Sequence, residues 1–507
     1  MDIHPTEAEF VKLARQGNVI PVHGELLADL ETPVSAFLKL DDGRFSYLLE
    51  SVEGTEKVAR YSFIGSRPRL LVTSAGRHVE ISELQDGRPR RVRRFETTED
   101  PLAEVERLMC GYRFVPVAGL PRFCGGLVGY LGYDVVRFVE RLPAHQVDDL
   151  RVPDLMLMLA DTMVIFDHAQ HKLLVVANAL TADKDPRAVY RQAVRDIRAM
   201  AARLRGPLPK PQLRPAVRPG AVRSNIPRER FIEMVERAKR YIRAGDIIQV
   251  VLSQRLEVTI RCTPFDVYRV LRSLNPSPYM YFLRFGSLCL VGSSPEMLVR
   301  CEDGHLETRP IAGTRPRGRT EQEDERLIHQ LRTSPKERAE HLMLVDLGRN
   351  DLGRVARTGS VRTPELMVVE KYSHVLHLVS GVTGRLRPNK NAYDVLRATF
   401  PAGTVAGAPK VRAMEIIAEL ERHDRGTYAG AVGYFSFSGN LDTCITIRTV
   451  LVKGQRAYIQ AGAGIVADSQ PDREYQETLN KAKGMLQAIA VAERRFAHGP
   501  SVRRAGT

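Results

Sequence analysis

A basic, proline-rich run at residues 206–228 restricts the folds open to this chain. It reads GPLPKPQLRPAVRPGAVRSNIPR. Proline has a fixed φ and no amide hydrogen, so a run this rich in proline holds neither helix nor sheet and is typical of a linker. We therefore expect an N-terminal region at residues 1–205, a linker at 206–227, a second folded region at 228–490 and a basic tail at 491–507.

The positive net charge of the chain is compatible with several kinds of binding partner. Its 507 residues, 43% of them hydrophobic, are enough for a large core, and the formal net charge is +15. Such a charge suits a nucleic acid, an anionic membrane surface or an acidic substrate, and it also arises from solvated basic faces. The arginines are scattered rather than interleaved with aromatic residues, so we expect no nucleic-acid partner. A nucleic-acid-binding protein stays as a remote alternative that predicts salt-dependent binding.

Cysteine spacing and the N-terminus indicate a cellular setting. The six cysteines form no C-x-x-C pair and have no histidine at zinc-ligand spacing, so we expect reduced core thiols and a cytoplasmic location. The N-terminus, MDIHPTEAEF, lacks the basic and apolar parts of a signal peptide. The longest apolar runs are too short to cross a bilayer, so no membrane segment is expected.

Strand-like and helix-like segments are expected on both sides of the linker. Before it we expect a helix at 6–16, strands at 44–64 around a glycine-containing turn, strands from 69 to 81, a glycine-rich run at 124–134, paired strands at 155–166 and 172–177, and a helix at 185–204. After it we expect a helix at 228–244, a strand at 246–260, a helix capped by Thr263, strands at 281–285 and 288–294, a hairpin turn at Asp303–Gly304, a loop at 310–318, and strands at 428–436, 443–452 and 457–462.

Two helices carry paired glutamates. The segment SPKERAEHLMLVDLGRNDLGR at 334–354 begins with a predicted capping box, and its Glu337 and Glu340 lie about one turn apart. Near the C-terminus, Glu474 and Glu477 repeat the spacing, with Lys481 one further turn on. Paired carboxylates could bind a hard divalent cation, but glutamates also decorate solvated helix faces.

Five further positions combine polar side chains with apolar or glycine-rich surroundings. Gln249 is either a satisfied core amide or a site residue, and the histidines of YSHVLHLVSG are site or core residues. Arg448 stands inside ITIRTV, where a guanidinium is costly unless it faces a cavity or an anion. Thr404 is the expected cap of a helix whose first amides could bind a carboxylate. Together with the glutamates, these residues indicate a site for a small dianionic substrate held by a divalent metal.

A series of ordered motifs resembles the chorismate-utilising enzymes, most closely the large subunits of anthranilate synthases. These motifs are GDIIQVVLSQR, NPSPYM, GSSPE, PIAGTRPRG, ERAEHLMLVDLGRNDLGRV, HLVSGVTG, FPAGT and GAGIVADSQPDREYQETLNKA, with LLES near the N-terminus. The resemblance implies an α/β (α+β) fold with two facing, mostly antiparallel sheets wrapped by helices. It makes residues 1–205 a regulatory, sheet-contributing region and residues 228–490 the chorismate-binding catalytic domain.

The resemblance also implies roles for single residues. Glu296 would protonate the departing C4 hydroxyl, and His377 would take the C2 proton as pyruvate leaves. Glu340 and Glu477 would bind Mg²⁺, with Glu337 and Glu474 close by. The implied substrate-binding residues are Gly313, Thr314, Thr404, Tyr428, Arg448, Gly462, Ala463, Gly464 and Lys481.

Residues at two positions distinguish the different kinds of chorismate-utilising enzyme from one another. Isochorismate and salicylate synthases carry a water-activating lysine where this chain has Gln249. Aminodeoxychorismate synthases commonly carry a nucleophilic lysine where this chain has Ala312. Both positions favour amination at C2 and the formation of anthranilate, the first committed step of tryptophan biosynthesis. An aminodeoxyisochorismate synthase or an aminodeoxychorismate synthase component stays as the alternative.

The resemblance finally implies two partners. Ammonia would come from a separate glutamine amidotransferase subunit in a hetero-oligomer. Tryptophan would inhibit by feedback in a pocket formed by Glu50, Ser51, Pro278, Tyr279, Met280 and Cys444, although Met280 and Cys444 also suit an ordinary core.

Overall fold

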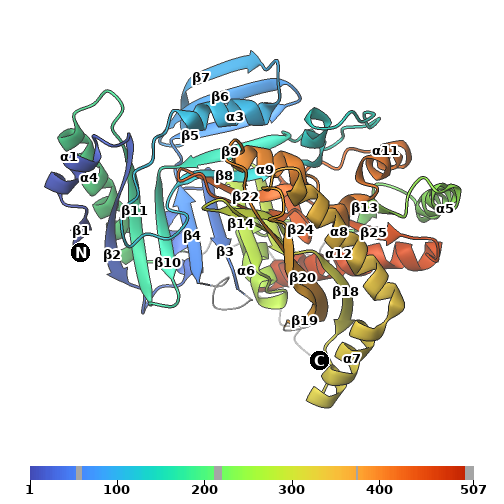
Figure 1. The fold of residues 1–507 in the computed structure, drawn as a ribbon. Helices are drawn as coiled ribbons and strands as arrows, with labels where there is room; N and C mark the ends of the chain where they lie inside the picture. Colours follow the sequence, from blue (N-terminus) through green and yellow to red (C-terminus); the bar gives the residue numbers. More distant parts are fainter. Residues whose placement is uncertain (53–59, 211–219, 373–374, 497–507) are drawn as a thin grey trace, which may run out of the picture.

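Two large antiparallel sheets form the centre of the molecule. The computed structural model describes residues 1–52, 60–210, 220–372 and 375–496 (Figure 1). The first sheet contains, in spatial order, β1 (Ile3–His4), β2 (Val19–Leu27), β11 (Lys172–Leu180), β10 (Thr162–Asp167), β4 (Tyr61–Ser66), β3 (Phe45–Glu50), β14 (Tyr279–Phe285), β15 (Leu288–Ser294), β24 (Thr449–Lys453), β25 (Arg456–Ile465), β13 (Gln249–Thr259) and β12 (Arg223–Ser224), with β21 (Gly407–Ala408) paired to β13.

The second sheet faces the first and also joins strands that are distant in sequence. It contains, in spatial order, β18 (Ile311–Pro316), β20 (Val375–Arg385), β17 (His305–Thr308), β16 (Met297–Glu302), β23 (Leu441–Ile445), β22 (Ala431–Ser436), β8 (Gly126–Leu131), β9 (Leu155–Ala160), β5 (Leu70–Ala75), β6 (His78–Gln85) and β7 (Arg88–Glu96), with β19 (Arg362–Lys371) paired to β20. The expected pair of antiparallel sheets is confirmed.

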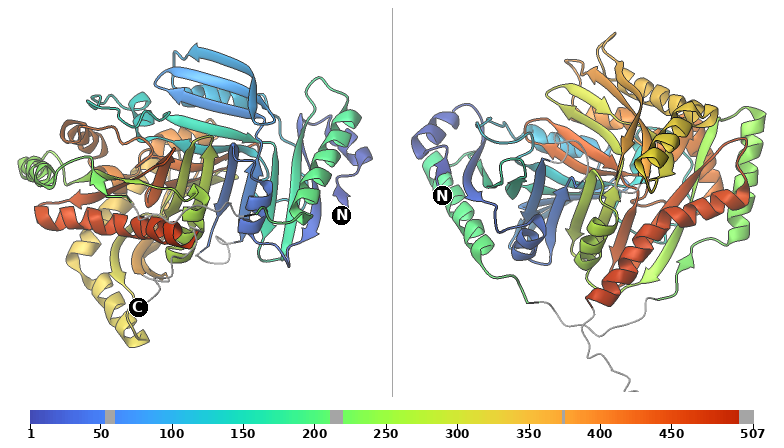
Figure 2. Two further views of the ribbon diagram at one scale, coloured as in Figure 1. Left: turned by 180° about the vertical axis from the view of Figure 1, so that it is seen from behind. Right: turned by 90° about the horizontal axis from the view of Figure 1, so that it is seen from below.

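Helices cover the outer faces of both sheets. They are α1 (Glu7–Leu13), α2 (Pro33–Leu40), α3 (Pro101–Cys110), α4 (Pro186–Arg205), α5 (Arg228–Ala244), α6 (Pro264–Leu274), α7 (Glu321–Thr333), α8 (Pro335–Gly353), α9 (Ala392–Thr399), α10 (Gly403–Ala406), α11 (Lys410–Leu420) and α12 (Pro471–Arg495), with the 3₁₀ helix η1 (Tyr133–Phe138). The long helix α12 packs on β25 and on α6 (Figure 2). No helix among the described residues is long and apolar enough to span a bilayer.

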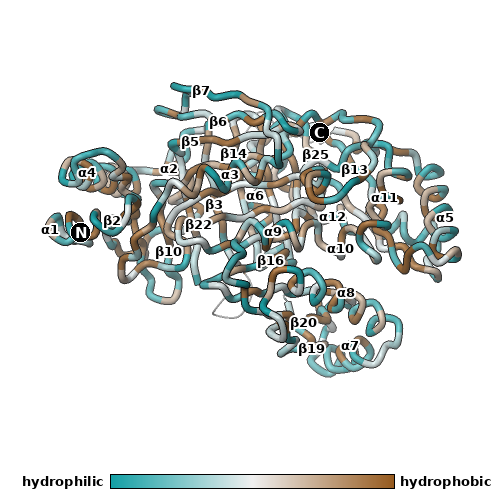
Figure 3. Tube along the Cα trace, turned by 45° about the horizontal axis from the view of Figure 1, so that its top comes forward, coloured by the Kyte–Doolittle hydropathy of each residue, from teal (hydrophilic) through white to brown (hydrophobic). Residues whose placement is uncertain are grey.

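Apolar side chains fill three layers around the sheets. A middle core lies between the sheets and includes Val128, Met158, Tyr281 and Leu283. One outer core packs α1, α2, α4, α6 and α12 on the first sheet, and another packs α3, α8 and α9 on the second. The central strands are the most hydrophobic part of the trace, whereas the edge strand β7 is largely hydrophilic (Figure 3). All six cysteines are free, as expected for reduced thiols, and all but Cys110 are buried.

Strands from both sides of the proline-rich run enter each sheet. In the first sheet β3 pairs with β14, and in the second β8 pairs with β22. Residues 211–219 of the expected linker lie outside the described residues. The end of the run is not simply a linker, because Arg223 and Ser224 pair with Glu257 and Leu256 at the sheet edge.

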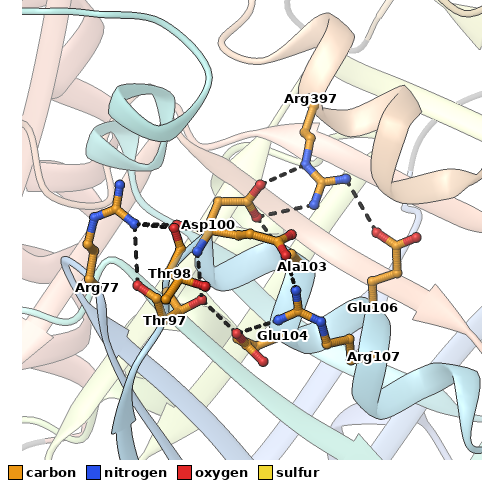
Figure 4. A network of polar contacts seen from close by, with 10 residues as sticks. Arg77, Thr97, Thr98, Asp100, Ala103, Glu104, Glu106, Arg107 and Arg397 are labelled. Carbon is orange, nitrogen blue, oxygen red and sulfur yellow. Dashed lines mark hydrogen bonds and ion pairs between the residues drawn. The ribbon is translucent and has the colours of Figure 1, made fainter.

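A polar network also joins the two parts of the chain. Asp100 accepts a hydrogen bond from the amide of Ala103 at 2.7 Å, which caps α3. The same carboxylate accepts hydrogen bonds from the guanidinium of Arg397 on α9, which also pairs with Glu106 (Figure 4). Helices from opposite sides of the proline-rich run are thereby held together.

Several element boundaries differ from the expectation. The apolar run 155–166 forms two strands, β9 and β10, which enter different sheets on either side of Asp161. The segment 443–452 likewise divides into β23 and β24. Residues 310–318 are not a loop, because β18 pairs with β20 there. The basic tail begins later than residue 491, since α12 continues to Arg495.

Candidate active site

Glu296 is a buried carboxyl group at the junction of β15 and β16. Its exposed fraction is 6%. Burial raises the pKa of Glu296 to about 8, against smaller opposing effects of the Ile311 amide, the Thr404 hydroxyl and Lys481. The carboxyl group therefore carries its proton at neutral pH and can donate it.

Thr404 lies beside Glu296, but it does not cap a helix. The short helix α10 begins at Gly403, and its N-cap residue is Ala402, which makes no side-chain cap. The expectation of a capping Thr404 was therefore wrong, because Thr404 is already inside the first turn. Its buried hydroxyl lies close enough to the Glu296 carboxyl to lower the pKa of that group, although within the described parts of the chain the contact does not have the geometry of a full hydrogen bond.

His377 lies on β20 against the glycine turn of β18. Its Nδ1 is 3.0 Å from the Thr314 hydroxyl and 3.4 Å from the Gly313 carbonyl oxygen. Burial lowers the pKa of His377, opposed by the Gly313 carbonyl and helped by the positive charge of Arg448. A neutral imidazole can accept a proton, so the histidine suits a general base. His374, the other histidine of the motif, lies outside the described residues.

Gln249 and Glu340 meet across the site. The Gln249 amide donates to Glu340 Oε1 at 3.2 Å, so β13 and α8 are in contact. Burial raises the pKa of Glu340, the Gln249 hydrogen bond lowers it, and the carboxylates of Glu337 and Glu477 raise it. The two glutamate-bearing helices therefore face one another, and the gathered negative charge favours a cation.

The start of α8 differs in one detail from the expected capping box. Ser334 accepts a hydrogen bond from the Glu337 amide at 3.4 Å, so the serine cap is present. The Glu337 side chain does not return the bond, because its carboxylate binds Arg315 at 3.0 Å. Gly313 has φ +60°, and a side chain there would meet Glu337 Oε2 at 2.8 Å. The β18 glycine is required by this close approach.

The second glutamate pair lies on α12 beside Lys481. Burial raises the pKa of Glu474, and nearby Glu477 raises it further, whereas Ser469 lowers it. Glu477 binds Lys481 Nζ at 2.7 Å, and the same ammonium donates to the Gly462 carbonyl oxygen at 2.9 Å. Lys481 therefore connects the acidic helix to the glycine strand β25.

The four glutamates are spread rather than tightly clustered. Among the described residues, three or more ligand atoms lie within 4.8 Å of one another only at Asp134, His145 and Asp424, near η1 and the end of α11. Sequence analysis did not single out that group, and its Asp134 already binds Arg137 at 2.7 Å.

Arg448 and Tyr428 form the cationic and phenolic side of the site. Arg448 is not within a strand as expected, but between β23 and β24 with φ 51°. A non-glycine residue rarely adopts this left-handed conformation, which here directs the chain from one sheet to the other. Its Nη1 donates to the Lys481 carbonyl oxygen at 2.9 Å. Burial lowers the pKa of Arg448, opposed by Tyr428 and Glu477.

The glycine strand β25 allows these side chains to approach the backbone. A side chain at Gly462 would meet the Tyr428 hydroxyl at 2.7 Å, and one at Gly464 would meet Gln249 Nε2 at 2.5 Å. Buried Ala463 lies between them. Every residue expected at the substrate or metal site thus belongs to this one group of contacting elements.

A second cavity, separate from the candidate active site, is lined by all six residues expected at the inhibitor pocket. Its volume is about 70 Å³, and Glu50, Ser51, Pro278, Tyr279, Met280 and Cys444 line it. Sequence analysis missed Arg122, Arg300 and Asp442 in its wall, because no local spacing connects strands so far apart. Asp442 binds Arg300 at 3.0 Å and accepts a hydrogen bond from Tyr279 at 3.0 Å.

Comparison with known proteins identifies the family. The sequence model of the chorismate binding enzyme family matches residues 49–487 of this chain. A relative from Acetivibrio thermocellus, anthranilate synthase component 1, is 48% identical, with 96% of this chain and 99% of the relative covered. Proteins of the same name from Aquifex aeolicus (strain VF5) and Pseudomonas putida are 50% and 49% identical, covering 97% and 96% of this chain and 99% and 98% of the relatives.

Solved structures agree with the sequence match. The crystal structure of anthranilate synthase component I from Streptococcus pneumoniae TIGR4 has a TM-score of 0.74 and 38% identity, covering 91% of this chain and 98% of that chain. The menaquinone-specific isochorismate synthase MenF of Escherichia coli, at 19% identity and a TM-score of 0.69, shares the fold. Because the family match and these relatives extend over nearly the whole length, the chain belongs to the chorismate binding enzymes and, among them, to the anthranilate synthase component 1 proteins.

Proposed function

We propose that this protein is the large subunit of an anthranilate synthase, a Mg²⁺-dependent lyase that converts chorismate and ammonia to anthranilate and pyruvate. The observation that carries the proposal is the buried carboxyl of Glu296, which keeps its proton at neutral pH beside the hydroxyl of Thr404. Relatives of nearly the same length bear the name anthranilate synthase component 1.

The proposed reaction uses Glu296 and His377 in turn. Glu296 protonates the C4 hydroxyl of chorismate, which leaves as water while ammonia adds at C2. His377 then takes the proton from C2, and the enolpyruvyl group departs as pyruvate. Burial supports both roles, since it keeps a carboxyl group protonated and an imidazole neutral.

The remaining side chains orient the substrate. The enolpyruvyl carboxylate would be bound by Arg448, Tyr428 and the backbone of Gly462, Ala463 and Gly464. Lys481 would hold strand β25 in place through its hydrogen bond to Gly462. Gly313, Thr314 and Thr404 would contact the ring. A guanidinium has five N–H donors, so Arg448, which donates one to the Lys481 carbonyl oxygen, could also bind an anion.

The glutamates of α8 and α12 fit a magnesium ion. Burial and neighbouring carboxylates raise the pKa of Glu340, against the Gln249 hydrogen bond and the positive charge of Lys336, so a bound cation would favour the ionised form of this group. Glu340 and Glu477 would hold the ion, with Glu337 and Glu474 near them. Their wide spacing suits Mg²⁺, which usually takes only one or two carboxylates together with substrate oxygens and water. The ion would neutralise the ring carboxylate of chorismate.

Gln249 favours ammonia over water as the nucleophile. Its amide is bonded to Glu340 and cannot act as a base, whereas a lysine there could activate water. An enzyme that stops at aminodeoxyisochorismate is the second candidate, because the same groups would serve the amination step.

We further propose that ammonia comes from a separate glutamine amidotransferase subunit, because the name component 1 carried by the relatives implies a second component. The purified chain should then use ammonium but not glutamine, and adding the amidotransferase should make glutamine a substrate.

The function is tested by a product assay. The purified chain is incubated with chorismate, Mg²⁺ and ammonium, and anthranilate fluorescence and pyruvate are followed together. Both products should form in equal amounts and disappear with EDTA. Chorismate consumption without pyruvate would favour the aminodeoxyisochorismate enzyme, and no consumption would contradict the proposal.

His377→Ala should separate the two halves of the reaction. Without the imidazole, amination should continue while pyruvate release slows by about 10²-fold or more, so aminodeoxyisochorismate should accumulate. Chromatography of the products at several times measures this ratio. His329→Ala, on the exposed side of α7, is the matched control. Normal anthranilate output from His377→Ala would contradict the assigned role.

We propose that the second cavity binds tryptophan as a feedback inhibitor. Apolar residues line it together with the buried acidic residues Glu50 and Asp442, which suits an aromatic ring and an amino group. Glu50 is held by Arg272 at 2.9 Å and by the Tyr268 hydroxyl. A ligand here would lie between the sheets and could stabilise one arrangement of the two.

Ser51→Phe should weaken this inhibition. A phenyl group at the cavity wall would occupy part of the space of about 70 Å³ and raise the inhibitory tryptophan concentration by about tenfold or more. Ser287→Phe, in the exposed turn between β14 and β15, is the control. Dose–response curves for both variants give the comparison, and unchanged inhibition of Ser51→Phe would refute the site.

A further inference from the structure

A small cavity joins Glu296 to a second buried carboxylate, Asp351. The space open to water-sized molecules is about 30 Å³, which is room for about two waters. Glu296 and Asp351 are both lining residues, together with Thr308, Thr399 and Thr404. The cavity thus has two acidic residues and three hydroxyl-bearing residues in its wall.

The hydroxyl groups leave hydrogen-bonding capacity for water. Thr308 donates to the Leu298 carbonyl oxygen at 2.9 Å, and Thr399 donates to the Val395 carbonyl oxygen at 3.0 Å. Each hydroxyl oxygen can still accept a hydrogen bond from water. The Thr404 hydroxyl lies beside the Glu296 carboxyl, and Thr404 is also a lining residue of the cavity. A cavity with this lining favours ordered water over an empty space.

Asp351 lies on the far side of this cavity, on α8, and is paired with Lys410 of α11. Lys410 Nζ lies 2.7 Å from Asp351 Oδ2 and donates to the Thr399 carbonyl oxygen at 3.3 Å. The side chains of Asp351 and Lys410 are 9% and 12% exposed. Burial raises the pKa of Asp351, whereas Lys410 and Arg354 lower it. The pair therefore has limited access to solvent and can exchange protons with it.

The proposed reaction requires a proton to return to Glu296 in each turnover. Glu296 gives its proton to the C4 oxygen, which leaves as water, and remains as a buried carboxylate. Addition of ammonia at C2 releases one proton, so the overall reaction needs none from outside. Glu296 itself must nevertheless be protonated again before the next chorismate reacts.

We propose that Asp351 returns this proton to Glu296 through water in the cavity. Asp351 is a carboxylate in its ion pair with Lys410. It takes a proton from solvent beside Lys410 and passes it to a cavity water, while that water gives a proton to the Glu296 carboxylate, and Asp351 is then ionised again. Asp351 does not touch the substrate and acts through Glu296 as a positioning residue. The inference rests on the proposed role of Glu296 as the proton donor.

Asp351→Asn tests this inference by rapid mixing. Glu296 already carries a proton at pH 7, so the first turnover should proceed at the wild-type rate, with about one anthranilate formed for each active site. Later turnovers should slow by about tenfold or more because reprotonation becomes limiting. KM for chorismate should not change. Asp346→Asn, an exposed residue on the same helix, is the matched control.

Two further variants separate proton return from a structural role. Asp351→Glu keeps a carboxyl group and should recover faster steady-state turnover. Thr308→Val removes a cavity hydroxyl but keeps the ion pair, and it should slow only the later turnovers. If Asp351→Asn does not fold, Thr308→Val gives the same comparison.

The outcomes distinguish this inference from the proposed function. Equal slowing of the first and later turnovers, or no slowing in either variant, would overturn the role of Asp351. Failure of the wild-type chain to form anthranilate would instead contradict the proposed function.

Discussion

Glu296→Gln is expected to lower kcat for anthranilate formation by about 10³-fold. Glutamine keeps the size of the side chain but has no acidic proton, so the C4 hydroxyl would have to leave without protonation. The substitution is mild for folding, because the glutamate is buried and already neutral at pH 7. Steady-state kinetics with saturating ammonium measure the loss, and circular dichroism shows whether the fold is kept. Glu302→Gln, at the other end of β16, is the matched control.

The wild-type pH profile should report the same group. The pKa of Glu296 is raised to about 8, so the protonated form is present below this pH and is lost as the pH rises through it. At a constant concentration of free ammonia, kcat should therefore fall on the alkaline side with a midpoint of about 8. A kcat for Glu296→Gln within twofold of the wild type would refute the proton-donor role.

Glu340→Gln should abolish turnover while the protein stays folded. The variant keeps the hydrogen-bonding shape but removes the negative charge that would hold Mg²⁺, and we expect kcat/KM to fall by about 10³-fold. Without metal, burial and the neighbouring Glu337 and Glu477 already disfavour the charged form of Glu340. The Tm of the metal-free variant should therefore equal or exceed that of the wild-type chain.

Magnesium titrations complete this comparison. Wild-type activity should saturate with Mg²⁺ and vanish with EDTA, whereas Glu340→Gln should stay inactive at high Mg²⁺. Glu477→Gln should behave similarly, and Glu321→Gln, exposed at the start of α7, should behave as wild type. Full activity of Glu340→Gln would remove this residue from the metal site.

Local sequence signals were enough to predict most of the helices and turns. The helix at Arg228–Ala244 is found as expected, ending at Gly245 with φ 84°. The Thr263 hydroxyl caps α6 by accepting a hydrogen bond from the Asp266 amide, and the Asp266 carboxylate accepts one in return from the Thr263 amide. Asp303–Gly304 forms the turn between β16 and β17. Caps and glycine turns depend on neighbours within a few residues, so their signals survive in any tertiary context.

The glutamate spacing was also readable, but its meaning was not. One turn separates Glu337 from Glu340 and Glu474 from Glu477, and both pairs lie on helices as predicted. Sequence left open whether they decorate a solvated face. The hydrogen bond from Gln249 on β13 to Glu340 on α8, together with the packing of α12 on β25, brings Glu340 within the electrostatic reach of Glu477. That approach depends on contacts between residues far apart in the chain.

Tertiary structure alone decided which sheet each strand enters. The apolar run 155–166 and the segment 443–452 each supply strands to both sheets, which alternating hydrophobicity cannot reveal because both faces of these strands are buried. The passage of the chain from β23 in one sheet to β24 in the other places Arg448 at the candidate active site in a left-handed backbone conformation. Burial of Glu296 and the cavity that it shares with Asp351 likewise arise from side chains that meet only in the folded chain. Sequence thus determined the local elements and the kinds of chemical group, whereas the pairing of distant strands determined the environments that make those groups reactive.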